Sequence, residues 1–199
     1  MKARTLTPVA PIKSLALAAL LTLSATALAE PLKPLVDDFA TAGNNSLGLQ
    51  RQYISDSVAG GASTMNHTLA DGVLTVSGEI VPARGQLGWT SCALPLNAQG
   101  LAQNAAAYQG VLLRIKVSEG NVSLTVNSTE VTNFDYHAAP LAVPADGQFH
   151  EVKVPFSSLQ RAWSEQIPLN PSTLNGLSIV AYSPQAAPFE YQLDEVRFY

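Results

Sequence analysis

The chain has 199 residues, of which 47% are hydrophobic and 13% are charged, and its formal net charge is −4. An acidic chain with 11 Lys and Arg residues lacks the basic surface that binds nucleic acid or an anionic membrane, so we predict neither partner. The length suits a single domain with a full hydrophobic core. Cys92 is the only cysteine, which excludes an internal disulfide.

The first 29 residues have the pattern of a secretory signal peptide. Lys2 and Arg4 begin a basic segment, an apolar stretch follows, and an A-x-A sequence ends at Ala29. We therefore predict cleavage after Ala29 and a mature domain of residues 30–199, exported to the bacterial periplasm or secreted. The mature chain would keep 8 basic residues against 15 acidic ones, a formal charge of −7. No later segment is apolar over the length that a transmembrane helix needs, so we predict no membrane insertion after cleavage.

The remaining chain predicts strands rather than helices. In chain order the predicted strands are 36–39, 50–54, 73–80, 88–94, 111–117, 122–127, 131–136, 150–154, 177–182, 189–193 and 196–199. The alternation is clearest at 111–117, where apolar residues share one face and Arg114 and Lys116 lie on the other. Gly120 lies in a turn signal between 111–117 and 122–127, which predicts a hairpin.

Turns separate these short strands, and helices have little room between them. Only 99–107 and 157–165 favour short helical turns. Many short strands separated by clusters of Gly, Pro, Asn and Asp are typical of a two-sheet antiparallel β-sandwich. We therefore predict an all-β fold in one domain.

Common catalytic motifs are absent from the sequence. It contains no GxSxG elbow, P-loop, HExxH or GxGxxG pattern, and its three histidines are not spaced as metal ligands. We predict a protein that is not an enzyme and needs no cofactor. The alternative is a hydrolase or lyase that uses Asp56 or Asp135 with His137 as an acid–base pair.

Two clusters are candidates for binding. Asp56 precedes two glycines in 53–63, so this segment is either a strand connection or a loop that presents amides to a ligand. Asp135, Tyr136 and His137 lie in 133–140, where aromatic faces and hydrogen-bonding groups suit a sugar ring or a partner peptide. The alternative is that the aromatic residues lie in the core with His137 at the rim.

A set of different short motifs extends in order along nearly the whole mature chain. They are Asp37-Asp38-Phe39, Ser55-Asp56 to Gly60-Gly61-Ala62-Ser63, Gly78, Gly88-Trp89, Tyr108-Gln109-Gly110 to Arg114, Phe149 to Val154-Pro155-Phe156, and Phe189-Glu190-Tyr191-Gln192-Leu193-Asp194-Glu195-Val196. In order and spacing this set resembles the complex I intermediate-associated protein 30 family. The resemblance implies a galactose-binding-like β-sandwich of jelly-roll type. It also implies a non-catalytic function, because the mitochondrial members are assembly factors for respiratory complex I.

The same ordered set of motifs is similar to that of family 11 carbohydrate-binding modules. These modules also open with Asp-Asp-Phe, carry a segment like Pro155-Phe156-Ser157-Ser158 and close on a Phe-x-x-Asp pattern. In such modules a structural calcium often ties the first strand to the last. The resemblance therefore implies that Asp37, Asp38 and Asp194 supply oxygen ligands to calcium. The alternative is that these acids cap turns.

Two binding functions follow from the resemblance and the lack of catalytic motifs. The first is an exported β-sandwich that binds a protein partner, as an assembly factor does. The second is a carbohydrate-binding domain in which Trp89, Tyr136, His137 and Trp163 are candidate platform residues. Stacking on sugar rings requires at least two of these four side chains to lie exposed in one groove.

Overall fold

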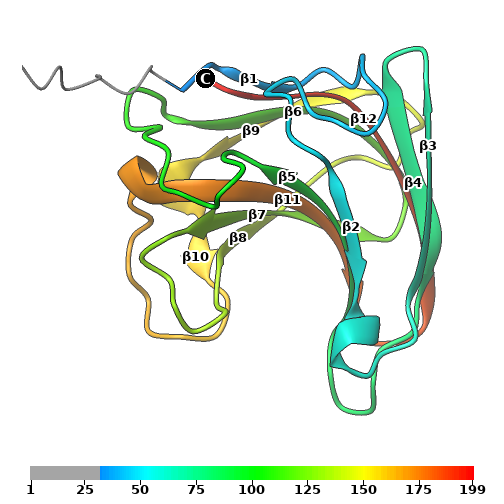
Figure 1. Ribbon diagram of the computed structural model, residues 1–199. Helices are drawn as coiled ribbons and strands as arrows, with labels where there is room; N and C mark the ends of the chain where they lie inside the picture. The colour runs from blue at the N-terminus through cyan, green and yellow to red at the C-terminus, as the bar shows by residue number, and fades with distance from the viewer. Residues whose placement is uncertain (1–31) are drawn as a thin grey trace, which may run out of the picture. The chain divides into compact units, whose positions relative to one another are not determined.

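The computed structural model describes residues 32–199, and the predicted signal peptide lies outside this range. Within these residues the chain forms two six-stranded antiparallel sheets that pack face to face, which confirms the all-β sandwich (Figure 1). None of the helices in this part of the chain has the length and hydrophobicity that a membrane span needs.

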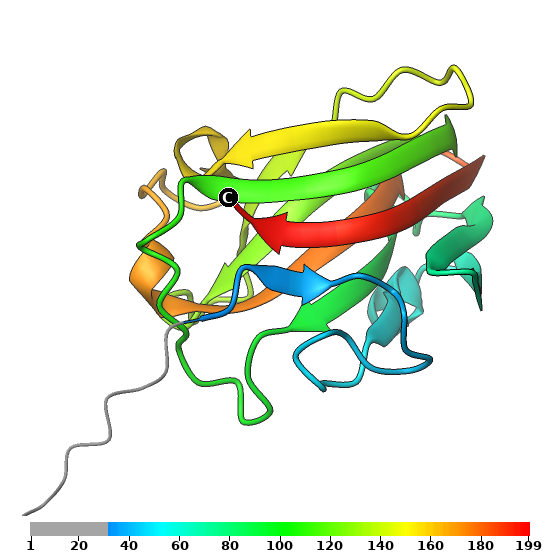
Figure 2. The same ribbon diagram turned by 90° about the horizontal axis from the view of Figure 1, so that it is seen from above.

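The first sheet contains the two chain-terminal strands. Its strand order is β3 (Thr64–Ala70), β4 (Val73–Ile80), β12 (Ala187–Phe198), β6 (Gly110–Glu119) and β9 (His150–Pro155), with β1 (Leu35–Asp37) paired to the end of β12. Figure 2 shows β9, β6 and β12 side by side, with β1 next to β12. The C-terminal strand β12 therefore holds the sheet together, because it pairs with three other strands.

The second sheet carries the site described below. Its order is β10 (Gln160–Arg161), β8 (His137–Pro140), β7 (Asn121–Ser128), β11 (Leu174–Ser183), β5 (Gly88–Pro95) and β2 (Gln52–Ser55). Three short 3-10 helices lie between strands of the described chain: η1 (Asp56–Ala59), η2 (Phe156–Ser158) and η3 (Pro171–Thr173). The predicted helical turn at 99–107 is wrong, because that segment is a loop with one isolated β-bridge.

The core lies between the two sheets and follows the period-two pattern of the strands. In β11, Leu177, Ile179 and Ala181 are fully buried, whereas the alternate residues face away from the core. Tyr191 of β12 is also fully buried, and its hydroxyl donates a hydrogen bond to the Ile179 carbonyl across the sandwich at 3.5 Å. Each strand therefore has one inner face in the core and one outer face.

Two further sequence predictions of local structure are wrong. The segments 111–117 and 122–127 are both strands but not a hairpin, because β6 lies in the first sheet and β7 in the second. Gly120, with a φ of 86°, makes the crossover between them, and a Cβ at this position would lie 2.8 Å from the Cβ of Phe189. The segment 131–136 is a loop rather than a strand, with Phe134 in the left-handed region at φ 62°.

Cys92 lies fully buried in β5, on the inner face of the second sheet. Burial, together with the nearby Asp37 carboxylate, raises the pKa of its thiol to about 12. Because the thiolate is the reactive form, we expect no reaction with an aromatic disulfide reagent at pH 8 in the folded protein and one thiol per chain after unfolding. Rapid labelling of the folded protein, followed by absorbance, would contradict this burial.

Candidate functional site

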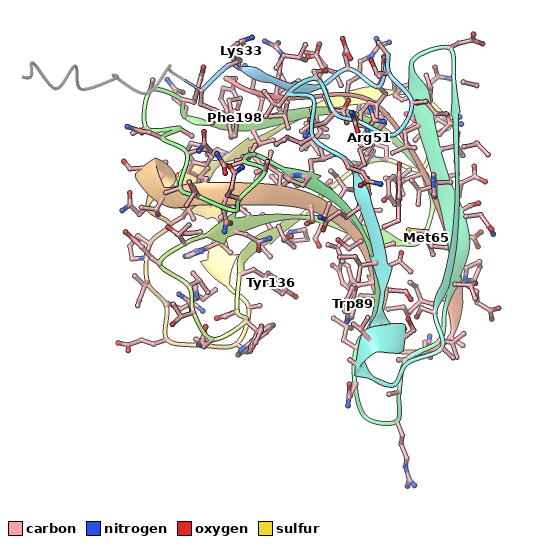
Figure 3. All side chains as sticks on the ribbon, in the orientation of Figure 1. Lys33, Arg51, Met65, Trp89, Tyr136 and Phe198 are labelled. Atoms are coloured by element: carbon pink, nitrogen blue, oxygen red, sulfur yellow. The ribbon has the colours of Figure 1, made fainter. Side chains whose placement is uncertain are left out.

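The outer face of the second sheet contains a groove, which we call the aromatic groove. It has a volume of about 210 Å³ and is lined by Leu87, Trp89, Ser123, Tyr136, Ala138, Pro140, Ala162, Val180 and Tyr182. In Figure 3, Tyr136 and Trp89 lie on opposite sides of the hollow beneath this sheet. No charged side chain lines the groove, so its chemistry is that of aromatic faces, small apolar groups and hydroxyls.

Strand register places the lining residues of the groove floor. Tyr182 of β11 is directly opposite Trp89 of β5, so the two aromatic side chains share the outer face as neighbours. On the other side of β11, Val180 is opposite Ser123 of β7, which in turn is opposite Pro140 of β8. Four neighbouring strands thus contribute to one continuous floor.

Asp56 fixes the position of Trp89 at one side of the groove. The Asp56 carboxylate is buried and accepts hydrogen bonds from the Ser63 backbone N–H at 3.0 Å, the Ser63 hydroxyl at 2.7 Å and the Trp89 backbone N–H at 3.2 Å. Gly61 packs against this carboxylate so closely that a Cβ there would lie 2.2 Å from its Cγ. Asp56 therefore does not line the groove, but it ties the η1 loop to the start of β5.

Asp135 has the equivalent role on the opposite side. Its carboxylate accepts hydrogen bonds from the backbone N–H groups of Tyr136 at 2.8 Å, Ala162 at 3.1 Å and Ser164 at 3.0 Å. It also forms a buried ion pair with Arg161, whose Nε lies 2.9 Å from Oδ2. Burial alone would raise the pKa of Asp135, but the hydrogen bonds from Arg161 and Ser164 hold it well below its usual range. Asp135 thus joins the two loops that carry Tyr136 and Trp163.

Tyr136 and Trp163 form an aromatic pair at this side of the groove. Their ring centroids lie 5.2 Å apart in an edge-to-face arrangement with an interplanar angle of 86°. Trp163 is 60% exposed beside the groove, whereas Tyr136 is half-buried in its wall. Burial and the neighbouring Asp135 carboxylate raise the pKa of the Tyr136 hydroxyl. A tyrosine hydroxyl is protonated at neutral pH even without this shift, so it can donate a hydrogen bond.

His137 does not reach the groove. It lies on the inner face of β8, opposite Val126 of β7, and is only 3% exposed. Its Nε2 is 2.8 Å from the Ile167 carbonyl, and it makes no hydrogen bond to Asp135. The acid–base pair of Asp135 and His137 that the sequence indicated is therefore not formed. Of the four candidate platform residues, the structure brings Trp89 and Tyr136 together and places Trp163 next to them.

The predicted calcium ligands lie apart from the aromatic groove. Both oxygens of Asp37 accept hydrogen bonds from the Arg51 guanidinium, at 2.6 and 2.8 Å, in a fully buried ion pair. Asp38 accepts a hydrogen bond from the Ser46 hydroxyl at 2.9 Å, and Asp194 pairs with Arg114 on the surface. No group of three His, Cys, Asp or Glu side chains within residues 32–199 is arranged to hold a metal ion. The calcium site therefore stays a prediction.

Tyr182 and Val180 are site residues that the sequence analysis did not single out. Their signal lies in the strand 177–182, where Leu177, Ile179 and Ala181 form the apolar inner face. The residues that alternate with these three form the outer face of the strand. An aromatic residue at the end of that outer face is a candidate for ligand contact. Recognising it requires the strand's inner face to be assigned first.

Two packed antiparallel sheets define a β-sandwich fold. The fold is similar to the family 11 carbohydrate-binding module of the cellulosomal cellulase Lic26A-Cel5E of Clostridium thermocellum, with a TM-score of 0.60 and 14% identity over 82% of this chain and 92% of that chain. The family 11 module from the same organism in complex with a β-1,3-1,4-mixed-linked tetrasaccharide gives a TM-score of 0.57 and 15% identity, over 83% of this chain and 94% of that one.

An agarase shares the fold over 82% of this chain and 24% of its own length, with a TM-score of 0.52 and 6% identity. Sequence comparison identifies the family directly. The profile described as Complex I intermediate-associated protein 30 (CIA30) matches residues 43–193, so the chain belongs to this family. No curated protein matches the chain in sequence.

Proposed function

We propose that the protein is a non-catalytic binding domain whose aromatic groove holds a carbohydrate. The observation that carries this proposal is that Trp89 and Tyr136, from segments far apart in the sequence, line one groove together with Tyr182. Aromatic faces contact the apolar C–H faces of sugar rings, and the flanking hydroxyls of Ser123 and the tyrosines suit sugar hydroxyl groups. The saccharide complex of a structurally similar module supports this ligand class.

The engaged carboxylates support a non-catalytic role. Acid–base catalysis requires a side chain within hydrogen-bond reach of the bound substrate. Asp135 and Asp56 are buried, and each accepts several hydrogen bonds from the protein itself. His137 lies on the inner face of its sheet, away from the groove. The two carboxylates therefore position the groove rather than act on a ligand.

A protein partner is the second candidate, and two observations favour it. The chain belongs to a family named for association with complex I intermediates. In addition, Phe134 is 94% exposed and Trp163 is 60% exposed on adjoining loops, and exposed aromatic residues are typical of protein interfaces. Export through a signal at residues 1–29 remains a prediction, because those residues lie outside the described structure.

Trp89→Ala tests the carbohydrate proposal. The domain 30–199 is first titrated by calorimetry with neutral oligosaccharides, including the β-1,3-1,4-mixed-linked tetrasaccharide and agaro-oligosaccharides. We expect the substitution to raise the Kd by about tenfold or more, because a central aromatic contact is commonly worth about 2 kcal/mol. The Asp56 hydrogen bond is to the Trp89 backbone, so the fold should be retained.

Tyr199→Ala is the matched control, because Tyr199 is an aromatic residue that follows β12 in the first sheet and contacts Lys153. It should leave the Kd unchanged. Equal losses in the two variants, or binding that survives Trp89→Ala, would contradict the groove as the site. Capture of a specific protein that is lost in Trp89→Ala, with no glycan bound by the native domain, would favour the protein partner.

A further inference from the structure

A second cavity lies on the outer face of the same sheet, at the opposite end from the aromatic groove. It has a volume of about 480 Å³, and we call it the amide pocket because its lining includes Gln50, Gln52, Asn97, Asn127 and Asn175. These side chains come from β2, β7, β11 and the loops next to β2 and β5. No charged residue lines this pocket either.

Strand register shows that the two cavities share one face. Along β11, Gly176 is opposite both Pro95 and Asn127, and Tyr182 is opposite Trp89. Positions 176 and 182 differ by an even number of residues, so they lie on the same side of the strand. Six residues of strand span about 20 Å, so Gly176 in one cavity and Tyr182 in the other lie about that far apart along β11.

The floor between the cavities is made of small side chains. Ser178 is the middle position of β11, flanked by Ala93 of β5 and Thr125 of β7. None of these three residues carries a bulky group that would divide the face. Ser178 and Thr125 are buried, and the two cavities lie at either end of this strip of small side chains.

The chemistry of the amide pocket complements hydroxyl groups. The Gln52 and Asn127 side chains are exposed and make no hydrogen bond to any residue in 32–199, so their carboxamides are available both to donate and to accept. The Oδ1 atom of Asn175, a third lining residue, is buried and has no hydrogen-bond partner among the described residues. Because a sugar hydroxyl both donates and accepts, it pairs with carboxamides without requiring a charge on either side.

We propose that the outer face of the second sheet holds one extended, uncharged oligosaccharide that stacks in the aromatic groove and continues into the amide pocket. This inference rests on the proposed function. It specifies the ligand as a chain of several neutral sugars rather than a single sugar, a disaccharide or an acidic glycan. A carboxylated chain is disfavoured because neither cavity offers a cation and the protein is acidic overall.

The test is calorimetric titration with ladders of mixed-linked β-glucan and agaro-oligosaccharides from two to six sugars, together with oligogalacturonides of the same lengths. We expect the Kd to fall with length in one neutral ladder and the oligogalacturonides to bind at least about tenfold more weakly. The variant Gln52→Ala/Asn127→Ala should weaken the longest ligand by about two- to tenfold per lost hydrogen bond and leave the shortest binding ligand unchanged. Asn66→Ala is the matched control. It also removes an exposed carboxamide, but from β3 of the first sheet.

The outcomes separate the two proposals. Equal affinity for short and long neutral ligands, or tight binding of oligogalacturonides, would overturn the extended neutral chain and leave the aromatic groove as a binding site. No binding to any saccharide in the ladders would overturn the proposed function and this inference with it. Loss of length dependence in the double variant but not in Asn66→Ala is the result that supports both.

Discussion

Arg51→Met is expected to lower the free energy of unfolding by about 3–5 kcal/mol, because it leaves the Asp37 carboxylate buried without its counter-charge. Asp37 lies at the end of β1 in the first sheet, and Arg51 directly precedes β2 in the second. The guanidinium also donates a hydrogen bond to the Thr41 carbonyl at 2.8 Å and lies 5.0 Å from the centre of the Phe39 ring. The pair therefore fastens the N-terminal segment across both sheets.

Urea unfolding measures this change in the free energy of unfolding, provided that the native protein and the variant have the same m-value. In the double variant Asp37→Asn/Arg51→Met, the Asn carbonyl can still accept the Phe39 N–H and no charge is buried, so much of the lost stability should return. Arg114→Met is the exposed control, and removing that surface pair should cost no more than about 1 kcal/mol. A similarly small loss of unfolding free energy in Arg51→Met would show that the buried ion pair does not stabilise the packing of the N-terminal segment.

Asp135→Asn is expected to produce a comparable loss, about 3–5 kcal/mol at pH 7, and to weaken ligand binding as well. The substitution removes the charge that pairs with Arg161 and places an amide donor among backbone N–H groups. Because these contacts hold the loops of Tyr136 and Trp163 together, the aromatic groove should lose its shape. Asp146→Asn, an exposed carboxylate that contacts His150, should leave both the unfolding midpoint and the binding unchanged.

The stability difference between the native protein and Asp135→Asn should depend on pH. The folded protein lowers the pKa of Asp135, so its stabilising contribution is complete above the ordinary Asp pKa of about 3.9. That contribution is lost as the pH falls through the folded-state pKa. The difference should therefore be largest at neutral pH and narrow below about pH 4 in urea titrations. A difference that grows on acidification would contradict the ion pair with Arg161.

The strands were predictable from the sequence to a much greater extent than their pairing. Alternation located β4, β6, β7 and β9, because each strand buries one face in a common core. It did not reveal that β6 and β7 belong to different sheets, since both turn apolar faces toward the same interior. The edge strand β3 was missed because its polar residues mostly face solvent. Asp71-Gly72, both with positive φ, forms the hairpin turn before β4, and this dipeptide was the available signal.

The site was predictable in its aromatic residues and not in its carboxylates. Trp89 and Tyr136 were singled out, and the fold brings them into one groove. Asp56 and Asp135 had the residue type of ligand-binding groups, but both are turned inward to hold loops together. Whether an acidic side chain faces solvent or accepts several backbone N–H groups depends on loops that meet only in the folded chain. Those contacts therefore could not be predicted from the sequence alone.

The most direct measurement of carbohydrate binding in the aromatic groove is tryptophan fluorescence. The chain has two tryptophans, and Trp89 lines the groove while Trp163 stands beside it against Tyr136. Titration of the native domain with the mixed-linked tetrasaccharide and the agaro-oligosaccharides should change the emission in a saturable way for at least one of them. The change should be largely lost in Trp89→Ala and retained in Tyr199→Ala. Saturable binding by calorimetry without any change in emission, or no binding by either method, would contradict a carbohydrate site in this groove.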